Sequence, residues 1–116
     1  YQKWAFKAQS FVQSSPAVAD GAVYIGSFDT CLYSLDAQTG ALKWTYETEN
    51  AIDSSPAVAG GIVYVGSDDG TIYALNTETG KKQWEYKTGS EVDSSPSIVD
   101  GFLYVGSVDG KIYSLQ

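Results

Sequence analysis

The chain has 116 residues, enough for one ordinary domain, with a hydrophobic content of 43% and a formal net charge of −7. Its seven basic residues are all Lys, so it is poorly equipped to neutralise phosphates, and we expect neither a nucleic acid nor an anionic membrane as a partner. The absence of His excludes Ser-His-Asp catalysis and His-ligated metal sites, and a single Cys cannot form an internal disulfide. No apolar run reaches the length of a membrane span, and without an initiator Met or signal peptide we expect a mature form or an excised segment.

Three copies of a 40-residue unit organise the chain. A Ser-Ser-Pro motif begins at Ser14, Ser54 and Ser94, and a Tyr-x-Gly-Ser motif recurs at the same interval. Residues 14–49 match residues 54–89 at 19 of 36 positions, which chance does not produce. We therefore predict a single repeat domain over residues 1–116, in which repeat units at 10–49, 50–89 and 90–116 follow a separate segment at 1–9.

Each complete repeat is predicted to contain four short strands. In the second repeat these strands cover residues 54–59, 62–67, 71–76 and 81–87, and the glycines between them supply the positive φ that tight hairpins require. The second strand is apolar on both faces, as expected where a sheet is covered by a neighbouring sheet on each side. Four strands in a period of about 40 residues predict an all-β fold made of β-propeller blades.

The first segment, residues 1–9, is predicted to be the fourth strand of a blade. Its Trp4 occupies the position of Trp44 and Trp84 in the repeats, while the third repeat stops after its third strand. We therefore expect three blades, with the N-terminal strand as a latch that completes the last of them. Three blades cannot close a ring, so the chain is expected either to form a homo-oligomer, such as a dimer that closes six blades, or to be part of a longer propeller.

The repeat resembles that of the pyrroloquinoline-quinone (PQQ) repeat family, whose blade motif is Ala-x-Asp-x-x-Thr-Gly-x-x-x-Trp. Residues 34–44 and 74–84 follow this motif with mild departures at Ser34 and Asn76. The resemblance implies an extracytoplasmic location and a structural role for the recurring aromatic residues, with the motif Trp docking neighbouring blades. These aromatic residues are Trp4, Trp44, Trp84, Tyr33, Tyr73 and Tyr113.

The acidic residues concentrate in two sets of loops that emerge on one face of a propeller. Nine of the fourteen lie there: Asp29, Asp68, Asp69, Asp109, Glu47, Glu49, Asp53, Glu91 and Asp93. At the mouth of the central channel, polar residues at the start of the innermost strands predict a binding ring for a cation or for a basic or hydroxyl-rich ligand. The ring comprises Gln13, Ser14, Asp53, Ser54, Asp93 and Ser94. The alternative is that Asp and Ser form turns and keep the loops solvated. Asp68 and Asp69 could also suggest a catalytic carboxylate pair, but two adjacent residues on a hairpin turn are expected to form a solvent-exposed tip.

We expect a non-catalytic scaffold that binds a protein or a polar ligand through this acidic face, with no cofactor. The alternative is a fragment of a quinoprotein dehydrogenase, since the PQQ-repeat family also includes such enzymes, the propeller lipoprotein that helps assemble outer-membrane barrels, and sensor propellers. The dehydrogenases carry an adjacent Cys-Cys pair against the quinone, whereas this sequence has Cys31 alone. Cys31 is expected at the start of a strand and partly exposed, either as a tolerated substitution or as the site of an intermolecular disulfide.

Overall fold

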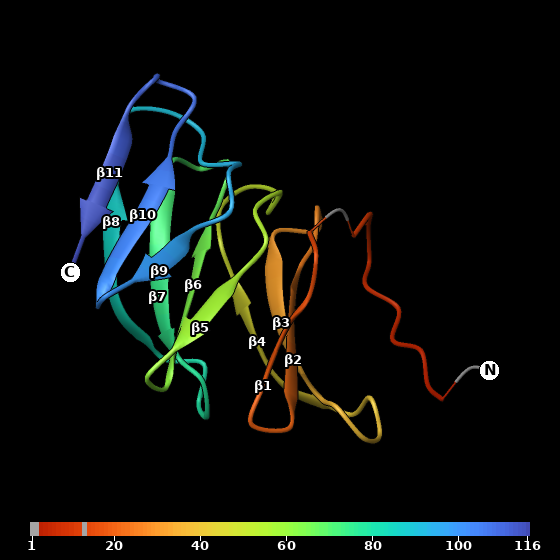
Figure 1. Ribbon diagram of the computed structural model, residues 1–116. Helices are drawn as coiled ribbons and strands as arrows, with labels where there is room; N and C mark the ends of the chain where they lie inside the picture. The colour runs from red at the N-terminus through yellow and green to blue at the C-terminus, as the bar shows by residue number, and fades with distance from the viewer. Residues whose placement is uncertain (1–2, 13) are drawn as a thin grey trace.

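The computed structural model describes residues 3–12 and 14–116, which form three antiparallel sheets (Figure 1). The first sheet consists of β1 (Ala17–Ala19), β2 (Ala22–Gly26), β3 (Cys31–Asp36) and β4 (Leu42–Glu47). The second consists of β5 (Ala57–Ala59), β6 (Ile62–Gly66), β7 (Thr71–Asn76) and β8 (Lys82–Lys87). The third consists of β9 (Ser97–Val99), β10 (Phe102–Gly106) and β11 (Ile112–Leu115). No helix in the described residues could span a membrane.

The predicted all-β fold of propeller blades is confirmed, and the three blades form an open row. Within each sheet the strands follow one another as hairpins, and the first turn of blade 1 places Asp20 and Gly21 at φ values of 50° and 77°. The inner strand β5 is shorter than the predicted segment 54–59. It begins late because the Ser54 hydroxyl, rather than a backbone group, accepts the Gly66 N–H at 2.9 Å.

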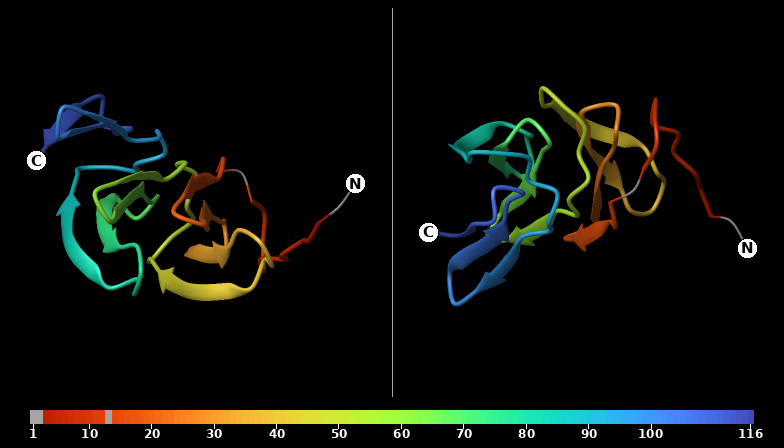
Figure 2. Two further views of the ribbon diagram at one scale, coloured as in Figure 1. Left: turned by 60° about the horizontal axis from the view of Figure 1, so that its bottom comes forward. Right: turned by 90° about the horizontal axis from the view of Figure 1, so that it is seen from above.

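The hydrophobic core lies between the blades. One cluster joins Leu32 of blade 1 to Ile52, Val63 and Val65 of blade 2, and all four side chains are fully buried. The second cluster joins blade 2 to blade 3 in the same way. Figure 2 shows the sheets fanning out side by side, with the short strands on the inner side and β4 and β8 on the outer side. Each blade is therefore stabilised mainly by its neighbours.

The repeated Trp side chains dock one blade onto the next. Trp44, on β4, donates its Nε1–H to the carbonyl of Thr77 in blade 2 at 2.8 Å. Its ring packs against Gly80, where an added Cβ would lie 2.7 Å from the ring and where φ is +77°. Gly80 is therefore required both for its positive φ and for the close approach of the indole.

Residues 3–9 take the corresponding place beside blade 1. Trp4 donates to the Ala37 carbonyl at 2.9 Å and packs against Gly40, as Trp44 does one repeat later. These residues form no β-ladder within the chain, because the strand that a latch would complete is β11, in the blade at the other end of the row. The pairing of this segment with β11 as a latch therefore stays a prediction, although Trp4 already packs on blade 1.

Candidate functional site: the acidic loop face

Backbone hydrogen bonds bring the two sets of acidic loops to the same end of the sheets. The Ile52 N–H donates to the Ser27 carbonyl of blade 1 at 3.0 Å, and the Asp68 N–H donates to the Ala51 carbonyl at 2.8 Å. The β4–β5 loop is thus held between the β2–β3 turn and the β6–β7 turn. The β8–β9 loop is held in the same way, one repeat later. We call the acidic residues of these turns and loops the acidic loop face.

The first serines of the Ser-Ser-Pro motifs act within their own blades. Ser14 is buried, accepts the Gly26 N–H at 2.9 Å and donates to the Gly26 carbonyl at 3.1 Å. Ser54 is buried and bonded to the Gly66 N–H, while Ser94 makes the same bonds to Gly106 in an exposed setting. These hydroxyls are therefore already engaged in holding the inner strand to the second strand.

The second serines link the blades to one another. The Ser15 N–H donates to the Ser55 hydroxyl at 2.7 Å, and the Ser55 N–H donates to the Ser95 hydroxyl at 2.8 Å. In the predicted ring, Gln13 lies outside the described residues, whereas Asp53 is half-buried and Asp93 is exposed. The two carboxylates are therefore the ring members best placed to meet a ligand.

Three of the predicted acidic residues are structural. Asp69 accepts the Tyr73 hydroxyl at 2.6 Å, the Thr71 N–H at 2.8 Å and the Glu49 N–H at 3.1 Å. Asp29 and Asp109 make equivalent bonds in the other blades. Burial alone would raise the pKa of Asp29, but the hydrogen bonds from Tyr33 and from backbone amides outweigh it and lower that pKa. The recurrence of Asp four residues before Tyr in every repeat is the sequence signal for this role.

Asp68 behaves differently from its neighbour. Its side chain is half-buried, and its Oδ1 is buried without a hydrogen-bond partner among the described residues. The pKa of this carboxyl is raised to about 6, first by burial and then by the charges of three acidic neighbours. These neighbours are Asp53, Glu91 and Asp93. The expectation of an exposed hairpin tip at Asp68 and Asp69 is therefore wrong, because the adjoining loops cover the turn.

The sequence does contain a signal for Asp68. In the other two repeats the same position holds Phe28 and Val108, so the second repeat places a carboxyl where the fold otherwise places an apolar side chain. Its backbone still bonds as theirs do, each N–H donating to a carbonyl of the preceding loop. The raised pKa of Asp68 thus follows from placing a carboxyl at this half-buried position, among other carboxylates.

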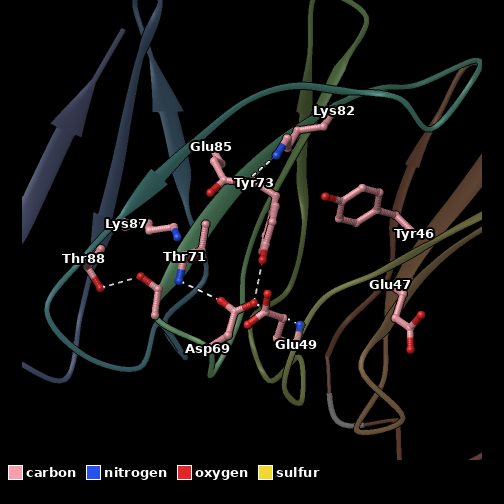
Figure 3. A pocket seen from close by; sticks show the side chains of 11 residues that line it. Tyr46, Glu47, Glu49, Asp69, Thr71, Tyr73, Lys82, Glu85, Lys87 and Thr88 are labelled. Carbon is pink, nitrogen blue, oxygen red and sulfur yellow. Dashed lines mark hydrogen bonds and ion pairs between the residues drawn. The ribbon is translucent and has the colours of Figure 1, made fainter.

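A polar hollow of about 270 Å³ lies between blades 1 and 2 (Figure 3). It contains charges of both signs, including Glu49, Lys87 and the ion pair of Lys82 with Glu85, in which Nζ and Oε1 are 2.5 Å apart. Tyr46 lines it on the blade 1 side. Its lining holds four carboxylates and two ammonium groups, so the hollow carries a net charge of −2 and favours a cation over an anion.

Cys31 is the first residue of β3 and is partly exposed, as expected. Within residues 3–12 and 14–116, no group of three or more acidic or Cys side chains is arranged to hold a metal ion.

Comparison with known proteins supports a specific propeller family. The model of the family described as outer membrane protein assembly factor BamB matches residues 2–116. No curated protein matches the sequence. Among solved structures, BamB from Moraxella catarrhalis is 27% identical with a TM-score of 0.87, covering 97% of this chain and 36% of that chain.

Two enzymes also share the fold. The quinohemoprotein alcohol dehydrogenase ADHIIG from Pseudomonas putida HK5 is 27% identical with a TM-score of 0.83, covering 94% of this chain and 19% of that one. A europium-containing methanol dehydrogenase is 22% identical with a TM-score of 0.75, covering 92% and 24% respectively, and this likeness shows the fold alone. The chain therefore spans well under half the length of each of these solved relatives.

Proposed function

The chain belongs to the PQQ-repeat propeller family whose model is described as outer membrane protein assembly factor BamB, and from this premise we propose a non-catalytic scaffold that binds a basic partner. The acidic loop face is the binding surface, and the partner is a protein segment or small ligand that presents Lys, Arg or another organic cation. Fold alone does not specify function, so the proposal depends on the chemistry of this surface.

The observation that carries the proposal is the crowding of carboxylates around Asp68. Its buried Oδ1 has no partner among the described residues, and its pKa is raised first by burial and then by three acidic neighbours that come from two different loops. A cation placed among them would satisfy the buried oxygen and relieve the repulsion between like charges. The rest of the acidic loop face would attract such a partner from a distance.

Binding of a fluorescently labelled oligolysine peptide, followed by fluorescence anisotropy at low ionic strength, tests the proposal. We expect Asp68→Asn, Asp53→Asn and Asp93→Asn each to raise the dissociation constant by about two- to fivefold, the range for the loss of one exposed or half-exposed charge. Binding should also strengthen as the pH rises through about 6, because Asp68 then ionises.

Acidic residues at the opposite end of the sheets provide the matched control. Glu78 and Asp100 lie in turns there and are exposed, so Glu78→Gln and Asp100→Asn remove the same charge without touching the acidic loop face. If these variants weaken peptide binding as much as the Asp68, Asp53 and Asp93 variants do, attraction is set by net charge alone and the assigned surface is wrong.

The second candidate function is a segment of a quinoprotein dehydrogenase, favoured by the 27% identity to the alcohol dehydrogenase. The sequence speaks against it, since there is no His and Cys31 has no adjacent Cys. Reconstitution with the quinone and calcium, followed by absorption spectroscopy and an alcohol oxidation assay, separates the two. Quinone binding with alcohol oxidation would replace the scaffold proposal.

We also propose an extracytoplasmic location and a protein as the natural partner. Both are supported by membership of a family described as an outer-membrane assembly factor. The completed propeller would arise either as a homo-oligomer or within a longer chain, and in both cases the acidic loop face would surround one opening of the ring.

A further inference from the structure

Four Asp-Gly pairs lie in the hairpin turns of this chain. Two join the first and second strands of a blade, at Asp20-Gly21 and Asp100-Gly101, and two join the second and third strands, at Asp69-Gly70 and Asp109-Gly110. In an Asp-Gly pair the glycine nitrogen can attack the Asp carboxyl with little hindrance, because Gly has no side chain. The reacting pair is the same in all four turns, so the fold decides which of them react.

The reaction needs only the chain and water. The Gly nitrogen forms a bond to Cγ of Asp and gives up its proton, and one carboxyl oxygen leaves as water, which closes a succinimide ring. Water then opens the ring at either carbonyl. Opening at the former backbone carbonyl leaves an isoaspartyl residue, whose main chain runs through Cβ and Cγ. Atoms balance over the two steps, and no oxidant or other co-reactant takes part.

Hydrogen bonds hold both reacting groups in the turns between second and third strands. The Asp69 carboxylate accepts three hydrogen bonds, from a Tyr hydroxyl and two backbone amides, and the Gly70 N–H donates to the Ser67 carbonyl at 3.1 Å. Asp109 and Gly110 make the same bonds one repeat later. Attack in these turns would have to break bonds at the carboxylate and at the amide together.

Neither reacting group is held in the other two pairs. Asp20 and Asp100 are exposed, and no hydrogen bond or ion pair within residues 3–12 and 14–116 engages their carboxylates. The N–H groups of Gly21 and Gly101 make no hydrogen bond within the same part of the chain. The Asp φ values of 50° and 51°, followed by Gly φ values of 77° and 82°, are typical of type I′ turns. In such a turn the closing hydrogen bond uses the N–H of the residue after the Gly, so the Gly N–H stays free.

The exposure of this turn is a property of the blade itself. In blade 2, which has a neighbouring blade on each side, the same turn consists of Gly60 and Gly61. Both are exposed, and an added Cβ would have open space around it, as it would at Gly21 and Gly101. Blade 2 therefore shows that the turn stays uncovered between packed blades and that it folds without an Asp.

We propose that Asp20 and Asp100 are modification sites that convert spontaneously to isoaspartate, while the Asp residues of the β6–β7 and β10–β11 turns are protected by their hydrogen bonds. The product keeps its negative charge but adds one atom to the main chain of a two-residue turn. Such turns set the register of the strands that they join, so the change weakens the pairing next to the turn, that of Ala19 with Ala22 in blade 1.

The modified turn would also be a site for an enzyme. Isoaspartate presents a carboxylate directly on Cα, and this is the group that a repair methyltransferase esterifies with S-adenosylmethionine. A methyltransferase of this class is therefore the partner that the modified turn would take. The turns lie at the opposite end of the sheets from the acidic loop face, so this inference goes beyond the proposed function and does not depend on it.

Storage of the protein near neutral pH and physiological temperature, followed by proteolysis and mass spectrometry, tests the proposal. Electron-transfer fragmentation locates isoaspartate in the peptides, and methyl transfer from labelled S-adenosylmethionine by an isoaspartyl methyltransferase measures its total. We expect it to form at the two free turns at least about tenfold faster than at the two protected turns, the factor for breaking one hydrogen bond to a charged group. Equal rates at all four turns, or no isoaspartate at Asp20 and Asp100, would overturn the proposal.

The same chain in concentrated urea is the matched control. Unfolding frees every carboxylate and amide, so the difference between the turns should disappear. A difference that persists would assign the selectivity to the flanking residues and refute the role of the fold. Asp20→Gly and Asp100→Gly copy the turn of blade 2, and each should remove isoaspartate from one turn without changing the others.

Asp100→Asn provides a second measurement at the same turn. Its amide forms the same succinimide with loss of ammonia in place of water, and ammonia leaves more readily from a neutral amide than water does from a carboxylate. Isoaspartate should therefore accumulate faster at this turn than in the wild type, and slower accumulation would contradict the free turn. For the same reason, Asp100→Asn serves as a control for peptide binding only when freshly prepared.

Discussion

Replacing Asp68 by Asn removes a carboxyl whose ionisation opposes folding. Its pKa in the folded chain is about 6, against about 3.9 in an unfolded chain, so ionisation above the unfolded value costs the folded state free energy. Two pKa units correspond to about 3 kcal/mol, and solvent screening of this half-buried group reduces the expected effect to about 1–2 kcal/mol. Since the folded pKa is raised, the wild-type penalty is absent below about pH 4, develops between about pH 4 and pH 6, and is complete above that.

Urea denaturation of the two proteins at a series of pH values measures this difference. Asp68→Asn should be more stable than the wild type by about 1–2 kcal/mol near pH 7 and of equal stability near pH 4. Glu78→Gln, at an exposed turn on the opposite end, removes the same charge away from the acidic loop face and serves as the control. A gain that is constant with pH, or one that grows towards acid, would refute the assignment of the raised pKa to Asp68.

Two further substitutions test contacts that hold the blades. Trp44→Phe keeps a ring against the second blade but loses the hydrogen bond to the Thr77 carbonyl. Thermal denaturation should therefore show a loss of about 1 kcal/mol in the free energy of unfolding. An unchanged denaturation midpoint would contradict this role. Ser54→Ala leaves the buried Gly66 N–H without its acceptor and should lower the free energy of unfolding, measured by urea denaturation, by about 1–3 kcal/mol. Ser94→Ala, at an exposed position, should lower it by less. Equal losses would argue against the role of burial.

The repeat alone was sufficient to predict the architecture. Its period predicted the third strand of blade 2 at residues 71–76, which is β7, and the motif Trp identified Trp44 as a docking residue that now contacts Gly80. The different roles of Asp68 and Asp69 in the candidate site could not be predicted from the sequence, because the two residues are adjacent and chemically identical. Only the turn geometry directs Asp69 towards Tyr73 and backbone amides and leaves an oxygen of Asp68 buried without a partner among the described residues.

The length of the inner strands also could not be predicted from the sequence. Residues 54–59 look like a continuous strand, but the Ser54 side chain replaces the backbone as the partner of Gly66. Hydrophobic periodicity does not reveal where a side-chain hydroxyl replaces a backbone carbonyl as the hydrogen-bond acceptor. The same substitution explains why serines that resemble ligand-binding groups are occupied within the blade.

The position of the two hydrophobic clusters has a consequence for cooperativity. Because the buried clusters lie at the joints between blades rather than inside any blade, a single blade detached from its neighbours would have almost no core of its own. Stability therefore grows with the number of joints, and the three blades described here share two. Unfolding should begin at the end blades, each of which is held on one side only.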